Sequence, residues 1–417
     1  MIGSPTSADS GHAAPWSLRG LFLATGAWTA AVAPFIAVIL HAHGLDPAQI
    51  GVLSALAALG ATFLVPAWGH LADVLVGRTA AFRIGVGIAG AASIALLLPL
   101  PPMVLAPILA SFAIFPALFL ALTDALAVGG LPAPERQYGP LRSLASLSFA
   151  VGVTVAGYMY DQAGYAAVPV VSIAWAAALY VLAGRVPDRT RDPNVRAIAG
   201  RGRGRTRRLG SISRALSVQP RLGPLLAVLT LAYAGMTGAM VFVSLRIVDV
   251  GGQPSDVGLS FGLAAVAEIP GLVLAGWAGR RVGLRSVFLW ACLAYGLCIA
   301  SWGVLATPLA INATRIITGV SFGALTTARV LVIGRLLPGE LQATGQTLVQ
   351  AATIGLSSVL GGLIGGVLYG AFGPTVYFAV AGALACVGGF GAWVVLDGPV
   401  GGPGHASWTG EATRPEP

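Results

Sequence analysis

Runs of about twenty apolar residues recur along almost the whole chain and constrain its fold more than any other feature. A helix of that length spans about 30 Å, which is the thickness of the hydrocarbon core of a bilayer. Only 9% of the 417 residues are charged, whereas a soluble domain carries about 25%. The sequence therefore predicts an all-α polytopic membrane protein.

Twelve membrane spans can be placed on these runs, six on each side of a polar segment. The first six lie at about 18–40, 49–72, 84–100, 103–129, 141–160 and 166–184, and the second six at about 222–245, 257–279, 286–305, 309–334, 345–369 and 375–396. The predicted domains are two six-helix bundles at 18–184 and 222–396, a linker at 185–221, and cytoplasmic tails at 1–17 and 397–417.

Arginine supplies all 24 basic residues, and its placement predicts the orientation. If both termini are cytoplasmic, 21 arginines lie in cytoplasmic segments and only Arg246 lies in an outside loop, while Arg315 and Arg329 fall within a span. Cytoplasmic loops of membrane proteins carry such an excess of basic residues. The arginine-only, alanine- and glycine-rich composition suggests a bacterial genome. We therefore expect a multi-pass protein of the bacterial cytoplasmic membrane.

The lack of lysine excludes ATP hydrolysis through a phosphate-loop lysine and covalent chemistry through a Schiff base. No nucleophile–base set or metal cluster is evident, so neither an enzyme nor a bound cofactor or metal is expected. The linker 185–221 contains eleven arginines but no interleaved aromatic residues that could stack on bases. We interpret it as a solvated connector that also fixes topology, with lipid headgroups as an additional partner and no nucleic acid.

An internal repeat relates the two bundles. Gly51 matches Gly258 at an offset of 207 within one set of similar residues, and Gly157 matches Gly366 at an offset of 209 within another. Parallel repeats of six helices are typical of alternating-access carriers, whose substrate sites lie near the midplane between the repeats. Glycines at such positions also allow helices to pack closely.

Glu268 lies near the centre of the apolar stretch Val257–Gly279, two positions before Pro270. A carboxylate at the bilayer midplane costs roughly 2.5–3.5 kcal/mol on insertion scales, so such residues usually have a function. We predict that Glu268 binds substrate and couples protonation to transport. The alternative is a permanently protonated Glu268 that bonds a neighbouring helix.

Asp124 and Arg142 are predicted to form a pair, because the short connection between spans four and five makes these helices neighbours. The pair is interpreted as substrate-binding, or alternatively as a structural ion pair at the membrane edge. Arg329 either faces Glu268 or extends to the cytoplasm. Arg315 is interpreted as extending to the outer surface or packing against neighbouring helices.

Further candidates come from polar and aromatic side chains within spans. Gln346, Gln350 and Thr353 form a stripe that can line a cavity or join helices, and Trp28 is either a stacking surface for a ring-bearing substrate or a packing residue. The charges expected to gate access at the cytoplasmic ends are Asp73, Arg78, Arg280 and Arg281.

These motifs resemble a known family. The segment Gly69–Asp73 with Gly77 and Arg78 resembles the signature of the major facilitator superfamily, although Gly77 lies one position later than usual. Asp124 followed by Tyr138–Arg142 resembles the group of lactose permease, phenylpropionate permease and nucleoside symporters. In that group an acid on helix four and an arginine eighteen residues later bind substrate. The segment Ala267–Pro270 is similar to the phenylpropionate-like members.

The departures from this pattern limit what the resemblance implies. Lactose permease couples protons through a histidine and a glutamate on helix ten, where this sequence has Thr318 and Ser321, and it uses a helix-nine arginine that is missing here. Sugar specificity is therefore not implied, and proton coupling is assigned to Glu268 and Asp124. The helix-four arginine and helix-five Gly-Pro pair of drug antiporters are also missing.

The sequence thus predicts a proton-coupled symporter of a small organic solute, in which two six-helix bundles rock about a central site. Its partners would be the solute, protons and the lipid bilayer, and the resemblance implies a monomer. The alternatives are proton-driven efflux of a drug or toxic metabolite and, from another class, a membrane sensor that does not transport.

Overall fold

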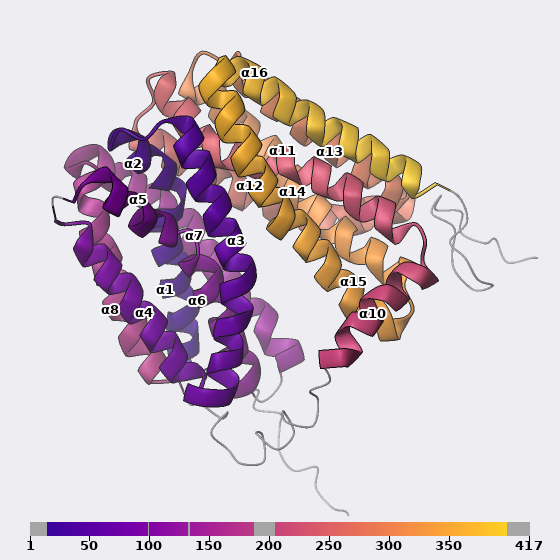
Figure 1. The fold of residues 1–417 in the computed structure, drawn as a ribbon, viewed down its shortest axis with the longest axis horizontal. Coiled ribbons are helices and arrows are strands. Elements are labelled where there is room, and N and C mark those ends of the chain that lie inside the picture. Colours follow the sequence, from indigo (N-terminus) through magenta and orange to yellow (C-terminus); the bar gives the residue numbers. More distant parts are fainter. Residues whose placement is uncertain (1–14, 99, 132–133, 187–204, 398–417) are drawn as a thin grey trace, which may run out of the picture.

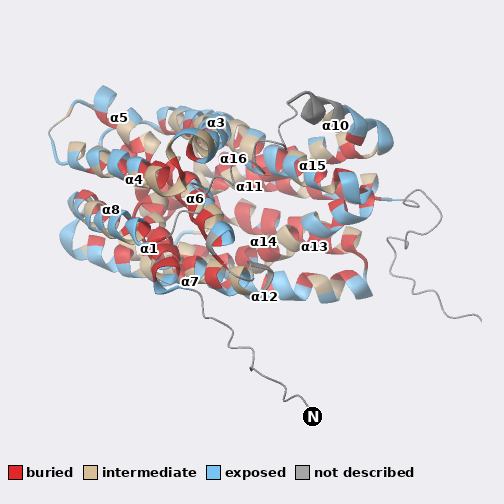
Figure 2. Cartoon of the chain, turned by 90° about the horizontal axis from the view of Figure 1, so that it is seen from below, coloured by how far each residue is buried: buried red, intermediate tan, exposed pale blue. Residues whose placement is uncertain are grey.

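The computed structural model describes residues 15–98, 100–131, 134–186 and 205–397, and every regular element within them is helical. Two helical bundles lie side by side, the first coloured indigo to magenta and the second red to yellow (Figure 1). Their outer surfaces expose large apolar side chains such as Phe63, Val273 and Leu309, while buried residues gather where helices face one another (Figure 2). Apolar side chains on the outer faces are expected where those faces contact lipid.

The first bundle consists of the helices and short helical turns between Trp16 and Gly184. They are α1 (Trp16–Val32), η1 (Ala33–Phe35), α2 (Ile36–Ala42), α3 (Pro47–Leu71), η2 (Ala72–Val76), α4 (Arg78–Ala95), α5 (Pro102–Ser111), α6 (Phe115–Gly130), α7 (Pro134–Ala163), η3 (Tyr165–Ala167) and α8 (Val168–Gly184).

The second bundle follows a short helix that lies within the predicted linker, α10 (Arg205–Val218). Its members are α11 (Leu222–Asp249), α12 (Pro254–Arg281), α13 (Leu284–Trp302), α14 (Pro308–Leu336), α15 (Gly339–Gln350), η5 (Ala351–Leu356) and α16 (Ser357–Val395). Helix α10 packs against α15, where Arg214 and Glu340 form an exposed ion pair at 3.7 Å.

Each of the twelve predicted spans corresponds to helical structure, which confirms the predicted fold class. Ten helices among the described residues are long and apolar enough to cross a membrane. The last of these, Gly339–Val395, contains two crossings, because Gly373 adopts φ 78° and Tyr377 then packs back against Gly365. The remaining span is α4, whose first turns carry Arg78 and Arg83.

Several helices are interrupted beside the interface of the two bundles. The first span changes to a 3₁₀ turn at η1, which contains Pro34, and α15 continues through the π-helical segment η5. Irregular backbone at membrane depth is tolerated where it is buried in protein or lines a cavity. Both interruptions contribute residues to the central cavity described below.

The repeat-related glycines form close contacts between the bundles. Gly157 packs on Gly258, and a Cβ atom on Gly157 would lie 3.3 Å from the Gly258 Cα. Gly51 packs on Gly366, and a Cβ on Gly51 would lie 2.7 Å from the Gly366 Cα. The two crossings are therefore α7 with α12 and α3 with α16, related to each other by the internal repeat. Glycine permits this close backbone approach because it has no Cβ.

Both crossings lie at the end of the molecule opposite the linker. Further contacts close the same end: the Ser255 amide donates to Asp161 Oδ1 at 2.9 Å, and the Ser244 hydroxyl donates to the Pro34 carbonyl at 2.9 Å. In this conformation the bundles are thus in contact at the end that lies away from the linker.

Candidate functional site

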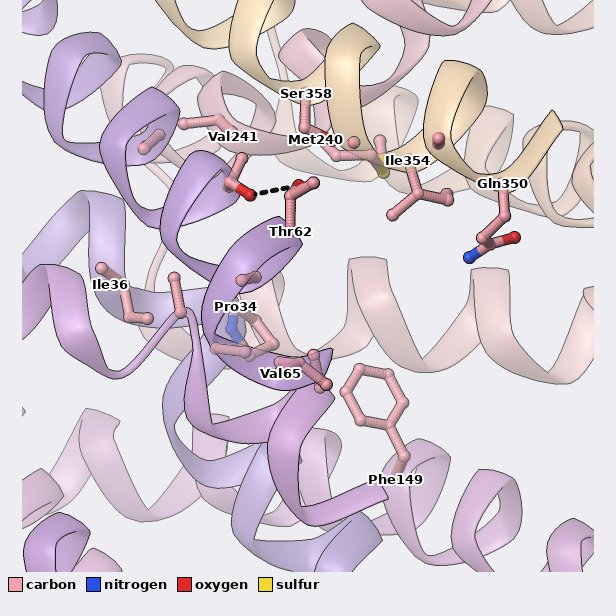
Figure 3. Close-up of a pocket in the computed structure, with 18 of the residues that line it drawn as sticks. Pro34, Ile36, Thr62, Val65, Phe149, Met240, Val241, Gln350, Ile354 and Ser358 are labelled. Carbon is pink, nitrogen blue, oxygen red and sulfur yellow. Dashed lines mark hydrogen bonds between the residues drawn. The ribbon is translucent and has the colours of Figure 1, made fainter. Parts of the chain in front are cut away.

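A cavity of about 980 Å³ lies between the two bundles. The first bundle contributes η1, α2, α3, α6 and α7, and the second contributes α11, α12, α14, α15, η5 and α16. Figure 3 shows Phe149 and Val65 opposite Gln350 and Ile354 across this space. Most of its wall is apolar, with Thr62, Gln346 and Gln350 among the polar side chains. Such a chamber suits an organic solute that has an apolar body and a few polar groups.

Gln346 and Gln350 both line this cavity, as one of their two predicted roles requires. The Gln346 amide also donates to the Val330 carbonyl at 3.0 Å, which joins α15 to α14. Thr353 instead is buried, and its hydroxyl donates to the Val349 carbonyl at 2.7 Å. Of the three residues, Gln346 and Gln350 therefore line the cavity, Gln346 also joins two helices, and Thr353 is buried away from the cavity.

Arg329 is the charged residue in the cavity wall. Its Nη1 donates to the Thr353 hydroxyl at 2.7 Å, and its guanidinium carbon lies 5.8 Å from the centre of the Tyr233 ring. These contacts turn Arg329 inward, toward α11 and η5. The structure thus favours the inward orientation over extension to the cytoplasm.

Asp124 and Arg142 lie together, with the Arg142 Nε 3.7 Å from the Asp124 Oδ1. Their side chains are 30% and 35% exposed, so the pair is accessible but partly desolvated. The Tyr138 hydroxyl lies close enough to Asp124 and Arg142 to interact electrostatically with both. The sequence motif included Tyr138 but gave it no role, although it precedes Arg142 by one helical turn and therefore shares its face.

Glu268 lies on α12 of the other bundle, within electrostatic range of Arg142 on α7, although the two side chains form no ion pair among the described residues. Arg142 precedes the cavity residue Phe149 by two helical turns, and Glu268 follows the cavity residue Phe261 by two turns. Residues at that spacing lie on one helix face. Asp124, Arg142 and Glu268 thus form a charged border on the side of the cavity nearer the linker.

Trp28 does not contact the cavity, which corrects its prediction as a stacking surface for substrate. The residue has 0% relative exposure, and its ring stacks on Phe112 with centroids 5.9 Å apart and meets Phe119 edge-on at 5.0 Å. Its indole nitrogen donates to the Ser172 hydroxyl at 3.1 Å. Trp28 is therefore a packing residue of the first bundle.

We expect Trp28→Ala to lower the free energy of unfolding by about 3–5 kcal/mol, because a buried indole leaves a large void. Trp28→Phe should keep most of the ring contacts and retain transport. Thermal unfolding in detergent, followed by uptake in proteoliposomes, measures both effects. Loss of transport by Trp28→Phe at unchanged stability would show instead that the indole contacts the solute.

The predicted gating charges interact within their own bundles. Arg78 Nε lies 2.8 Å from Asp73 Oδ1, and Arg78 Nη1 donates to the Ala125 carbonyl at 2.8 Å. Arg281 stacks over the Trp277 ring at 4.5 Å, and Arg280 is exposed beside it. Across the described ranges no ion pair joins the two bundles. The interaction expected to close one access state is thus not formed in this conformation.

Comparisons with known proteins agree with this architecture. The chain is 22% identical over 387 residues to the uncharacterized transporter YwbF of Bacillus subtilis, with 91% of this chain and 92% of the relative covered. It is 28% identical over 361 residues to the maltose permease of Geobacillus stearothermophilus, with 84% of this chain and 85% of the relative covered.

Solved structures share the fold. The nucleoside transporter NupG superposes with a TM-score of 0.75 at 14% identity, covering 92% of this chain and 99% of the other. A D-xylose-proton symporter superposes with a TM-score of 0.64 at 13% identity, covering 90% and 95%. The sequence pattern of the MFS_1 like family matches residues 15–380. This protein therefore belongs to the MFS_1 like family and is a multi-pass membrane transporter.

Proposed function

We propose that this protein is a proton-coupled symporter of a small organic solute in a bacterial cytoplasmic membrane, with both termini in the cytoplasm. The observation that carries the proposal is that Arg142 lies 3.7 Å from an acid of its own bundle, Asp124, and within electrostatic range of an acid of the opposite bundle, Glu268. Among the relatives and fold neighbours whose names state a substrate are a maltose permease, a nucleoside transporter and a D-xylose-proton symporter, and also a monocarboxylate transporter and a peptide transporter, so these names support a small organic solute without selecting one class.

In this proposal the solute occupies the cavity and its polar groups contact Asp124, Arg142 and Tyr138. Gln346, Gln350 and Arg329 contact the solute from the second bundle. When Glu268 is ionised, it attracts Arg142 across the interface. When Glu268 is protonated, this attraction is lost, and Arg142 interacts with Asp124 and the solute alone. Protonation thereby changes the interaction between the bundles and the affinity for solute together, which is the linkage that coupled transport requires.

The conformation supports alternating access. The bundles are in contact at the end opposite the linker, through Gly51 with Gly366 and Gly157 with Gly258. The predicted gating residues Asp73, Arg78, Arg280 and Arg281 remain in their own bundles at the linker end. Rocking of the bundles about the cavity would separate the glycine crossings and bring these charges together.

Replacing Glu268 with glutamine tests the coupling role. Glutamine keeps the size and hydrogen bonding of the side chain but cannot ionise, so the attraction to Arg142 cannot be switched. We expect Glu268→Gln to abolish accumulation driven by a pH gradient in proteoliposomes while solute exchange across the membrane persists.

The matched control is Glu340→Gln, which removes an acid that is 76% exposed and pairs with Arg214 outside the cavity. Exposed ion pairs contribute about 0–1 kcal/mol, so this variant should accumulate solute like the unmodified protein. Gradient-driven accumulation by Glu268→Gln at the control level would remove Glu268 from the coupling mechanism.

A further inference from the structure

Arg315 is a buried cation in the second bundle that the proposed transport cycle does not use. It lies on α14 and is 2% exposed. Its Nε donates to the Ser260 carbonyl at 3.3 Å, and its Nη1 donates to the Thr318 hydroxyl at 3.3 Å. The rings of Phe261 and Trp302 lie 5.4 Å from its guanidinium carbon. The side chain therefore packs inside the bundle and does not extend to the outer surface.

The charge of Arg315 has no acidic partner among the described residues. Its hydrogen-bond partners are the Ser260 carbonyl, the Thr318 hydroxyl and the thioether of Met240, and the neutral Tyr295 side chain lies within electrostatic range. A buried guanidinium is costly unless an anion neutralises it. Arginine also presents two parallel donors that match the geometry of a carboxylate.

Met240 occupies the place that a carboxylate would take. Its Sδ lies 3.5 Å from both Nη1 and Nη2 of Arg315, in front of the two terminal nitrogens. Thioether sulfur is only a weak acceptor, so these contacts leave the guanidinium poorly satisfied. The methionine side chain has three rotatable bonds and changes conformation readily.

The two residues in front of Arg315 belong to the cavity wall. Met240 and Phe261 both line the cavity, and Figure 3 shows Met240 at its border above Thr62. A rotation of Met240 away from Arg315 would therefore join the guanidinium to the cavity. Both terminal nitrogens contact the same Met240 sulfur, so a change in this one flexible side chain would free both of them.

The charge balance of the site also favours an anion. The ionisable groups of the cavity, its border and the wall behind it comprise three arginines, Arg142, Arg315 and Arg329, and two acids, Asp124 and Glu268. These carry one positive charge in excess when both acids are ionised, and two when one of them holds a proton. One anionic group on the solute would reduce the excess in either state.

We propose that the transported solute is a small organic monocarboxylate whose carboxylate displaces the Met240 sulfur and pairs with both terminal nitrogens of Arg315. This inference rests on the proposed transport function and names the substrate class of the same cavity. The apolar wall would receive the rest of the solute. Arg315 then supplies the recognition of charge, while Asp124 and Arg142 orient other polar groups.

Labelling of a cysteine at position 240 tests whether the positive charge of Arg315 acts on groups at that position, and it requires no knowledge of the natural solute. In a background with Cys292, Cys298 and Cys386 replaced by alanine, Met240→Cys is labelled with an anionic ethylsulfonate and a cationic trimethylammonium methanethiosulfonate. We expect the ratio of the anionic to the cationic rate to fall about tenfold when Arg315→Gln is added, because the local positive charge is lost. Val241→Cys, which also lines the cavity, is the control and should show a smaller change.

Protection experiments test the substrate class. Acetate, lactate and benzoate should slow labelling of Met240→Cys more than acetamide, lactamide and benzamide do, and Arg315→Gln should remove this difference while Arg329→Gln keeps it. Equal protection by acids and amides, protection by neither, or a preference that depends on Arg329 alone would overturn the proposal. The labelling experiments involve no proton gradient. They can therefore contradict the proposed substrate class while the Glu268→Gln result supports proton coupling, or support the substrate class while proton coupling is contradicted.

Discussion

Replacing Gly51 and Gly258 together with leucine should reduce transport at least about tenfold while the protein still folds and inserts. A Cβ on Gly51 would lie 2.3 Å from the Gly362 carbonyl oxygen, and a Cβ on Gly258 would lie 2.4 Å from the Val153 carbonyl oxygen. Backbone atoms cannot move aside at these distances without separating the helices. Both glycines lie within helices, where leucine is well tolerated. The strain therefore acts on the contact between the bundles.

The double variant should be held open at the end opposite the linker, because rocking cannot bring its helices together there. Ser244→Cys, placed where the unmodified protein joins Ser244 to Pro34, should then react faster with an impermeant thiol reagent applied from that side. Substrate binding should persist, because the cavity is not filled. Uptake, labelling and thermal unfolding of one preparation separate a trapped conformation from a misfolded one.

The control is Gly87→Leu on α4, where an added Cβ would have no atom within 4 Å. It places one leucine on a helix in the same way but should leave both uptake and Ser244→Cys labelling unchanged. Normal uptake by the Gly51→Leu/Gly258→Leu variant would show that the two glycine crossings do not need to re-form during transport.

The fold was largely predictable because the bilayer restricts the choices. Backbone groups in hydrocarbon must bond within their own segment, so an apolar run of sufficient length becomes a helix. The repeat-related glycines Gly51 and Gly258 also indicated close helix packing, since only glycine allows such close approach, but the sequence did not tell which helices cross. The interruptions at η1 and η5 were not predicted. Their hydrogen-bond patterns depend on the neighbouring bundle, and only Pro34 marks one of them in the sequence.

The site was predicted less completely, because hydropathy does not tell which face of a membrane helix points inward. The Asp124–Arg142 pair was predictable since a short connection makes α6 and α7 neighbours. The two predicted roles of Trp28, stacking surface and packing residue, could not be separated from the sequence, because apolar side chains surround it on α1 and suit both a cavity wall and a packed core. The two interpretations of Arg315 stayed open for the same reason: a charge near a helix end can extend to the surface or pack inward, and the structure shows that it packs beside Met240 and Phe261.

Replacing Arg142 with glutamine should reduce transport at least about 30-fold, equivalent to about 2 kcal/mol of lost interaction with solute. It should also lower the free energy of unfolding by about 1–3 kcal/mol, because Asp124 and Glu268 would lose their common partner. Fully buried pairs lose about 3–5 kcal/mol when one member is removed. The loss here is smaller because about a third of each side chain of the Asp124–Arg142 pair is exposed.

Adding Asp124→Asn to Arg142→Gln separates stability from function. The double variant removes the unpaired acid along with the cation, and replacing both members of an ion pair is often close to neutral for stability. We therefore expect its thermal unfolding temperature to recover toward that of the unmodified protein while transport stays lost, because the charges that orient the solute are gone. A purely structural pair at the membrane edge would behave differently: transport would recover together with stability. Uptake and unfolding measured on the two single variants and the double variant thus distinguish a substrate-binding pair from a structural one.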